Sequence, residues 1–259
     1  MNIDVVSVSQ KYGNLPILHD ISFTADSGEV VALLGPNGSG KSTLIKTIAN
    51  IFPPASGKIL IDGVDAVAID PIDRAKLIGY VPQYFHFTPF TTVLDTVLIG
   101  RRPYMSWVVT DDDLAVVDKS LATMYVSDFA GRFVNELSGG QLQRVFIART
   151  LAQQPMIYLF DEPTSSLDLR YQLKIVSAMQ QIVHDEKSCM LIALHDLNLA
   201  MRYADKVVVL KDGKIYACGT PDEVLTEETI RVVYGVCAEI VENSHGKFVF
   251  SYASSDMLR

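Results

Sequence analysis

This chain of 259 residues has few cysteines, no excess of positive charge and no long hydrophobic run. Its three cysteines, Cys189, Cys218 and Cys237, are too few and too widely spaced to suggest a disulfide framework or a zinc site. Cys189 and Cys218 lie in or beside strand-like runs, so we expect buried thiols, and a reducing, cytosolic setting fits. The 22 basic and 30 acidic residues give a net charge of -8. That balance argues against a nucleic-acid partner, because such proteins usually present basic faces.

No stretch of the sequence approaches the roughly 20 apolar residues that a membrane helix needs. The first residues also lack the basic segment and apolar stretch of a secretory signal. If the protein serves a membrane process, other chains must span the bilayer. The shares of apolar residues, 49%, and of charged residues, 20%, are those of an ordered globular protein.

Short runs rich in β-branched residues predict strands, and helical periodicity replaces them between about Phe85 and Ala152. The predicted strands are Ile3–Val8, Ile17–Phe23, Val30–Leu34, Lys58–Asp62, Ile78–Val81, Met156–Phe160, Met190–Leu194, Val207–Leu210, Lys214–Ala217, Glu239–Val241 and Lys247–Tyr252. The predicted helices include Ser42–Asn50, Val93–Gly100, Leu114–Tyr125 and Gly140–Ala152. Helices between the strands from Met156 to Leu210 give a βαβ rhythm. The pattern therefore predicts an α/β fold with a parallel sheet covered by helices.

A glycine-rich segment follows the apolar strand Val30–Leu34 directly and precedes a helix. It reads Gly35-Pro36-Asn37-Gly38-Ser39-Gly40-Lys41-Ser42 and matches the eight-position P-loop pattern. Its backbone N–H groups can cradle phosphates, and the helix start adds a positive dipole end. Lys41 can reach the β- and γ-phosphates, and the Ser42 hydroxyl can ligate Mg²⁺. The motif alone predicts nucleotide binding and leaves kinase, GTPase and ATPase open.

A second acidic element, Asp161-Glu162, ends the apolar run from Met156 to Phe160. Functional sites of open α/β sheets lie at this carboxyl edge of the strands. Asp161 is suited to hold Mg²⁺, and Glu162 to polarise an attacking water. Because Pro163 ends the strand, both acids can face the site. The alternative is a solvated acidic turn after a strand, and without the P-loop the Asp-Glu-Pro sequence would be weak evidence for a site.

The sequence also contains motifs that resemble those of the ATP-binding-cassette (ABC) ATPases, in the same order. These are Gln83 of Val81-Pro82-Gln83 for the Q-loop, Leu137-Ser138-Gly139-Gly140-Gln141 for the signature motif, Ser165-Ser166-Leu167-Asp168 for the D-loop, His195 for the switch histidine and Tyr12 for the aromatic that stacks on adenine. Two departures from the family pattern are Leu142, where relatives often carry arginine, and Ser166, where alanine is common. Neither touches a required chemical role.

The resemblance implies an ATPase that works with ATP and Mg²⁺ as a head-to-tail homodimer. Glu162, His195 and Lys41 would be catalytic, and Ser42, Gln83 and Asp161 would hold the metal. ATP would contact Tyr12, Gly35, Pro36, Asn37, Gly38, Ser39, Gly40, Lys41, Ser42, Thr43 and Gln83 of one subunit and Ser138, Gly139, Gly140, Gln141 and Asp168 of the other.

The same resemblance implies a P-loop NTPase core with a mostly parallel sheet, an N-terminal antiparallel β subdomain and a helical subdomain that carries the signature motif. We expect one ABC ATPase domain over 1–259, in which 1–84 and 153–235 form the core, 85–152 the helical subdomain and 236–259 a C-terminal extension.

The stretches from Thr92 to Tyr104 and from His195 to Asp205 resemble importer ATPases for iron–siderophores, haem and cobalamin. We therefore expect two separate permease subunits, a periplasmic or lipoprotein solute-binding protein, and a position on the cytoplasmic face of the membrane. Iron chelates rank first as solute, then cobalamin, then haem or an oxyanion such as molybdate or tungstate. Phe85, Phe87 and Phe90 either line the permease groove or belong to the helical core.

Three other functions fit the sequence less well than transport does. A soluble ABC ATPase acting on DNA or ribosomes would carry long coiled-coil inserts or two cassettes, and this sequence has neither. A non-catalytic nucleotide-sensing scaffold fits poorly with intact Glu162 and His195. An adenylate-type kinase would leave the signature motif unexplained.

Overall fold

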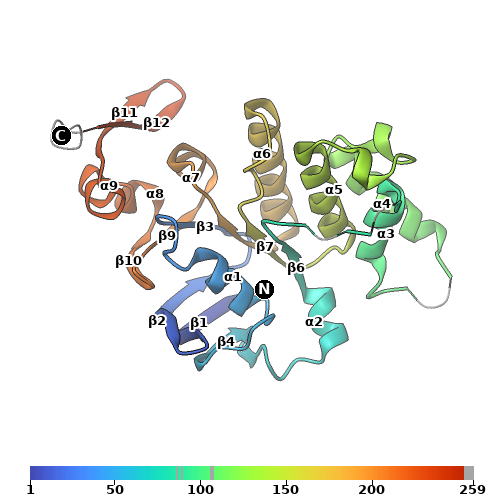
Figure 1. Cartoon of the computed structure of the whole chain (residues 1–259), viewed down its shortest axis with the longest axis horizontal. Helices are drawn as coiled ribbons and strands as arrows, with labels where there is room; N and C mark the ends of the chain where they lie inside the picture. Colours follow the sequence, from blue (N-terminus) through green and yellow to red (C-terminus); the bar gives the residue numbers. More distant parts are fainter. Residues whose placement is uncertain (86, 89, 106–107, 254–259) are drawn as a thin grey trace.

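The structure is a computed structural model that describes residues 1–85, 87–88, 90–105 and 108–253 (Figure 1). Its centre is a mixed sheet with the strand order β10-β9-β3-β8-β7-β6. Neighbouring strands from β9 to β6 run parallel, whereas β10 pairs antiparallel with β9. The strands are β3 (Val30–Leu34), β6 (Ile78–Val81), β7 (Ile157–Asp161), β8 (Cys189–Ala193), β9 (Lys206–Lys211) and β10 (Lys214–Gly219).

Each face of this sheet is covered, which explains why its central strands are apolar throughout. In β3, Val31 and Leu33 pack on the face shared with helix α1 (Lys41–Ile48) and the N-terminal strands. Val30, Ala32 and Leu34 face the opposite core. That core includes residues of α5 (Gly139–Ala152), α6 (Leu169–Glu186) and α7 (Leu197–Tyr203). The sheet therefore separates two hydrophobic cores.

A smaller antiparallel sheet lies on the α1 side of the central sheet. Its strand order is β2-β1-β4-β5, formed by β1 (Ile3–Tyr12), β2 (Leu15–Ala25), β4 (Ser56–Ile61) and β5 (Val64–Asp65). Asp62 and Gly63, with φ of 46° and 81°, form the turn between β4 and β5. Helix α2 (Pro71–Leu77) then leads back to the central sheet.

The helices between β6 and β7 lie together at one end of the molecule (Figure 1). They are α3 (Val93–Leu98), η1 (Ile99–Arg101), α4 (Asp111–Thr123), η2 (Ser127–Phe129), η3 (Val134–Glu136) and α5. The acidic run at the start of α4 caps that helix, because Asp113 and Thr110 form a capping box. The buried ion pair between Arg101 Nε and Asp113 Oδ1, at 2.9 Å, ties η1 to α4.

The C-terminal segment packs at the opposite end (Figure 1). It consists of α8 (Pro221–Val224), α9 (Glu227–Tyr234) and the antiparallel pair β11 (Cys237–Asn243) and β12 (Gly246–Tyr252). The side-chain amide of Asn198 in α7 bonds to the backbone N–H and C=O of Val249, which holds this pair against α7. Within the described residues, no helix is both long and apolar enough to cross a membrane.

The predicted fold class is confirmed: a mostly parallel central sheet, an antiparallel β subdomain and a helical region that carries the signature motif. Helix α2 was not predicted. It is short and has no buried residue, so it lacks the apolar stripe by which amphipathic helices are recognised. The expected burial holds for Cys189 but is wrong for Cys218, which is exposed. Cys218 lies on the edge strand β10, where alternate side chains are more exposed.

Candidate functional site

The phosphate loop, residues 35–42, connects the end of β3 to the start of α1. Gly35 has φ of 143°, and a Cβ there would collide with the backbone oxygen of Leu210. Gly40 is the N-cap of α1 with φ of 104°. Both positions need glycine, because other residues rarely adopt such angles. The geometry turns the loop tightly around the N-terminus of α1, where backbone N–H groups are available to an anion.

Lys41 lies inside this loop, with its ammonium group folded onto two loop carbonyls. Its Nζ donates to the oxygens of Gly35 and Pro36 at 2.8 and 3.2 Å. Burial lowers the pKa of Lys41, while the nearby Glu162 and Asp161 carboxylates oppose that shift. In the part of the chain that the structure describes, the buried Ser39 Oγ has no hydrogen-bond partner. A buried, unpaired hydroxyl at this loop suits a ligand oxygen such as that of a phosphate.

Asp161 is the last residue of β7 and is 1% exposed. The Ser42 hydroxyl donates to its Oδ1 at 2.7 Å. Burial raises the pKa of Asp161, against the lowering effects of the Ser42 hydrogen bond and of Lys46 and Lys41. Hydroxyl and carboxylate oxygens are the ligands that Mg²⁺ prefers, so the pair has the right chemistry for this ion.

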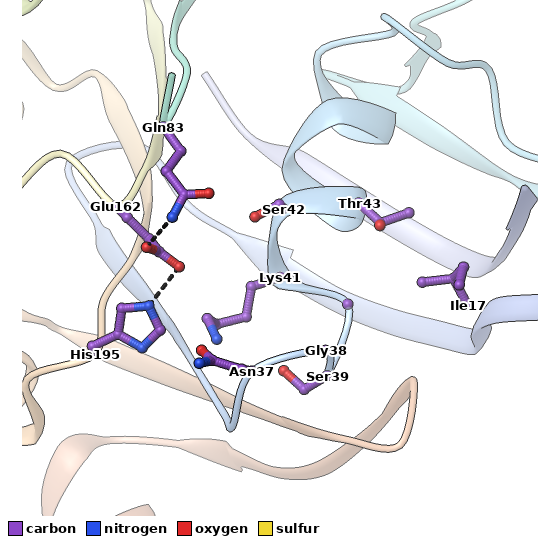
Figure 2. Close-up of a pocket in the computed structure, with 11 residues that line it drawn as sticks. Ile17, Asn37, Gly38, Ser39, Lys41, Ser42, Thr43, Gln83, Glu162 and His195 are labelled. Atoms are coloured by element: carbon purple, nitrogen blue, oxygen red, sulfur yellow. Dashed lines mark hydrogen bonds and ion pairs between the residues drawn. The ribbon is translucent and has the colours of Figure 1, made fainter. Parts of the chain in front are cut away.

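Glu162 follows with φ of 55°, a left-handed backbone conformation. This angle, rather than Pro163 alone, lets two consecutive acids face the same site although strand neighbours normally alternate. Gln83 Nε2 donates a hydrogen bond to Glu162 Oε2 at 2.6 Å. His195 Nε2 lies 2.6 Å from the other carboxylate oxygen, Oε1. Figure 2 shows Glu162 between Gln83 and His195, opposite Lys41 and the loop.

Residues of the P-loop, Gln83, Glu162 and His195 line one hollow of about 570 Å³ at the carboxyl edge of the parallel strands. Its lining residues are Ile17, Asn37, Gly38, Ser39, Gly40, Lys41, Ser42, Thr43, Gln83, Glu162 and His195. The structure thus brings the P-loop, Glu162, Gln83 and His195 together from segments far apart in the sequence. Ile17 was not among the predicted site residues, because an apolar side chain in a strand carries no functional signal.

The signature motif lines a different hollow, of about 490 Å³. Ser138 is the N-cap of α5 and forms a capping box with Gln141. Asp168 caps α6 by accepting from Tyr171 N at 3.0 Å. The described lining of this hollow contains Ser138, Gly139, Gly140, Gln141 and Asp168 but no P-loop residue. The P-loop and the signature motif of one chain therefore line two separate hollows.

Tyr12 lies at the end of β1 and is 44% exposed. Its ring meets Phe52 edge to face, with centroids 5.8 Å apart. An exposed aromatic ring of this kind can stack on a base. Tyr12 does not line the P-loop hollow itself.

The three phenylalanines at the start of the helical region separate into two groups. Phe85 stacks on the buried Phe146 of α5 at 4.2 Å and belongs to the core. Phe90 is 74% exposed, and Phe87 is also exposed. The rest of the segment from Phe85 to Tyr104 includes residues 86 and 89, which lie outside the described residues.

Known proteins are similar to this chain over most of its length. The model of the ABC transporter family matches residues 18–165, more than half of the chain. An uncharacterised ABC transporter ATP-binding protein of Methanocaldococcus jannaschii is 46% identical over 95% of this chain and 96% of its own. A cobalamin import ATP-binding protein of Halobacterium salinarum is 38% identical over 90% of this chain and 59% of its own. A probable siderophore transport system ATP-binding protein of Bacillus subtilis is 35% identical, over 93% and 88% respectively.

Solved structures agree with the sequence relatives. A metal-chelate type ABC transporter in an inward-facing conformation superposes with a TM-score of 0.83 at 26% identity and covers 99% of both chains. A dimeric bacterial ABC transporter cassette gives a TM-score of 0.78 at 30% identity, over 85% of this chain and 98% of its own. Together with the geometry of its P-loop, these matches show that the chain belongs to the ABC transporter family and is an ATP-binding ATPase of that family.

Proposed function

We propose that this chain is the ATP-hydrolysing subunit of an ABC importer that takes up a metal chelate through separate permease subunits. The observation that carries the proposal is the pair of separate hollows, one built around the P-loop and one around the signature motif. Each holds only part of what ATP hydrolysis requires. A head-to-tail homodimer would place the signature hollow of one subunit over the P-loop hollow of the other.

In the first hollow, the assigned roles follow from the groups that face it. Lys41 and the loop N–H groups would bind the β- and γ-phosphates. Ser42 and Asp161, together with Gln83, would hold Mg²⁺, which neutralises charge on those phosphates when it is bound. Tyr12 would stack on adenine, and the loop residues Gly35 to Thr43 would surround the phosphate chain.

Glu162 is the proposed general base, because its carboxylate faces the loop where a γ-phosphate would lie. It would take a proton from the attacking water as the water oxygen bonds to the γ-phosphorus. The bond from that phosphorus to the bridging oxygen breaks, and ADP and inorganic phosphate form. In the structure Gln83 and His195 contact Glu162. We infer that they exchange this contact for the metal and the γ-phosphate when ATP binds.

In the second hollow, the N-terminus of α5 offers the backbone N–H groups of Gly139 and Gly140, and that of Ser138 once it releases its hydrogen bond to Gln141 Oε1. These would bind the γ-phosphate of the partner subunit, with Gln141 and Asp168 beside them. The dimeric ABC transporter cassette among the similar structures supports this arrangement. Two ATP molecules would close the dimer, and hydrolysis would reopen it.

The proposed division of the chain follows these roles. Residues 1–84 and 153–235 would form the catalytic core, 85–152 the helical subdomain and 236–259 an extension. The helical subdomain would carry the motion to two permease subunits near Gln83 and the segment after it. The exposed side chains of Phe87 and Phe90 fit such a contact better than the core residue Phe85 does. The complex would place this chain on the cytoplasmic face of the membrane, with a solute-binding protein reached through the permease.

The relatives named for siderophore and cobalamin import, and the metal-chelate type transporter, support a chelated metal as solute. We rank iron–siderophores first, cobalamin second, and haem or an oxyanion after them. The test is to reconstitute the chain with its permease and solute-binding protein in vesicles and measure phosphate release with each solute. Stimulation by an iron chelate is the expected result. Stimulation by cobalamin or haem alone would revise the solute, and ATP hydrolysis that never responds to a permease would overturn the importer assignment.

A further inference from the structure

Gln143 is a buried amide in α5, two residues beyond the signature motif and 1% exposed. Its Nε2 donates to the backbone oxygen of Glu162 at 3.1 Å. Its Oε1 accepts from the backbone N–H of Ser166 at 3.2 Å. The nitrogen and the oxygen of the Gln143 amide therefore both form hydrogen bonds with the backbone of the segment that links Glu162 to the D-loop.

This segment holds Glu162 in an unusual backbone conformation. With φ of 55°, Glu162 adopts the left-handed region that residues other than glycine seldom enter. Such conformations persist when their surroundings fix them. The Glu162 carbonyl also accepts from Ser165 Oγ at 3.1 Å, but Ser165 belongs to the same turn. Gln143 supplies a hydrogen bond to this turn from a different element, helix α5.

The start of α5 also approaches the D-loop closely at Gly140. A Cβ on Gly140 would come within 2.7 Å of the Ser166 backbone oxygen. The helix that begins with the signature motif is therefore joined, one turn later, to the backbone of Glu162 in the same chain. Any shift of α5 against the D-loop would pull on the peptide that aims the Glu162 carboxylate at Gln83 and His195.

We propose that Gln143 is a positioning residue: its amide fixes the Glu162 backbone and the D-loop to the signature helix, and so sets the direction of the Glu162 carboxylate. The inference rests on the proposed role of Glu162 as the base. Gln143 touches neither ATP nor the water; it acts through Glu162.

The test compares Gln143→Met with Gln153→Met. Methionine keeps the length of glutamine and removes both hydrogen bonds. Gln153 is a matched control, because its amide, at the C-terminal end of the same helix, also donates to two backbone carbonyls, those of Ala75 and Ile78. We expect Gln143→Met to lower the kcat of ATP hydrolysis by about 10- to 100-fold, the size expected for a misaimed catalytic group, with unchanged ATP affinity. Gln153→Met should keep the wild-type kcat.

A double-mutant cycle separates positioning from general damage. In a Glu162→Gln background, adding Gln143→Met should not lower the residual single-turnover rate further, since its effect passes through Glu162. A rate that falls equally in both backgrounds would overturn the proposal, as would a wild-type kcat for Gln143→Met. If that variant fails to fold, Gln143→Asn, whose shorter amide cannot reach both partners, takes its place in the same cycle. A Glu162→Gln protein with wild-type turnover would instead disprove the proposed base.

Discussion

The two hollows are similar in volume but are built in different ways. Around the P-loop hollow, three charged side chains are buried and already hydrogen-bonded: Lys41 and Glu162, which line it, and Asp161, which accepts from the lining residue Ser42, are each at most 8% exposed. The signature hollow presents a helix N-terminus whose first residues are exposed, where the side chains of Ser138 and Gln141 bond to each other's backbone N–H groups. In the proposed function the first hollow binds ATP and supplies the base, whereas the second adds hydrogen-bond donors to the partner's ATP. We therefore expect mutations in the two hollows to impair ATP binding and turnover in different ways.

Glu162→Gln should give the largest effect, because the amide cannot accept the proton of the attacking water. Turnover should fall by about 10²–10⁴-fold, the range for loss of a general base. ATP binding should remain, and the protein should elute as a trapped dimer with ATP. Phosphate release and size-exclusion chromatography check both. Unchanged turnover would remove Glu162 from catalysis.

Lys41→Ala and Ser138→Arg should separate the two hollows. Loss of the buried ammonium should weaken ATP binding by roughly 10- to 100-fold, the size of a charge-assisted hydrogen bond. Ser138→Arg adds bulk at an exposed helix start, so ATP binding by the single subunit should persist while turnover falls by about 10²-fold or more. Titration with a fluorescent ATP analogue, beside phosphate release, distinguishes them. Equal loss of ATP binding in both variants would show that the two hollows do not have different roles.

Asp161→Asn should abolish turnover but stabilise the nucleotide-free protein at neutral pH. Burial raises the Asp161 pKa, so the folded state binds this proton more tightly than the unfolded state does. The contribution of this proton to the free energy of unfolding is fully present below the ordinary aspartate pKa of about 3.9. It is lost as the pH rises through the pKa of Asp161 in the folded state. Asparagine avoids that loss, so each 1 kcal/mol gained should raise the Tm by roughly 2–4 °C at pH 7.

The gain should vanish near pH 4. Thermal melts of both proteins across this pH range, without nucleotide or Mg²⁺, measure it. A Tm difference that does not change with pH would show that ionisation of Asp161 is not its cause.

Tyr12→Ala should have the smallest effect of the set. Stacking on a base is worth about 1–3 kcal/mol, and the exposure of Tyr12 places it at the low end, roughly a fivefold loss of ATP affinity. Tyr12→Phe keeps the ring and serves as the control. The ratio of the GTP affinities of Tyr12→Phe and Tyr12→Ala should be similar to the ratio of their ATP affinities, because stacking tolerates different bases. An alanine variant with wild-type ATP affinity would exclude the stacking role.

The central sheet and the P-loop could be predicted because their signals are local. Val30–Leu34 is apolar throughout, and the glycines that follow fit only a tight turn, so strand, loop and helix appear in the sequence in the order the structure has them. The turn between β9 and β10 is equally local: Asp212 and Gly213 have φ of 49° and 72°, angles that an Asp-Gly pair adopts readily. Local backbone preference decides these elements.

Other features depend on contacts between distant segments and carry no local signal. Gln143 lies 19 residues from Glu162 in the sequence, and nothing in the predicted helix shows which carbonyl its amide meets. The left-handed angle at Glu162 likewise has no signal in the local sequence, because residues other than glycine seldom adopt it. Cys218 sits in a strand pattern, but only the strand order shows that its strand is an edge.

The composite site can be tested most directly by mixing Lys41→Ala and Ser138→Arg subunits, each of which has a defect in both sites of its own homodimer. In the mixed dimer one site combines the intact P-loop of one chain with the intact signature motif of the other. We predict that a 1:1 mixture of the inactive variants regains about a quarter of wild-type ATP hydrolysis, since about half of the dimers are mixed and each has one intact site. A mixture that is no more active than its components would contradict a site shared between two subunits.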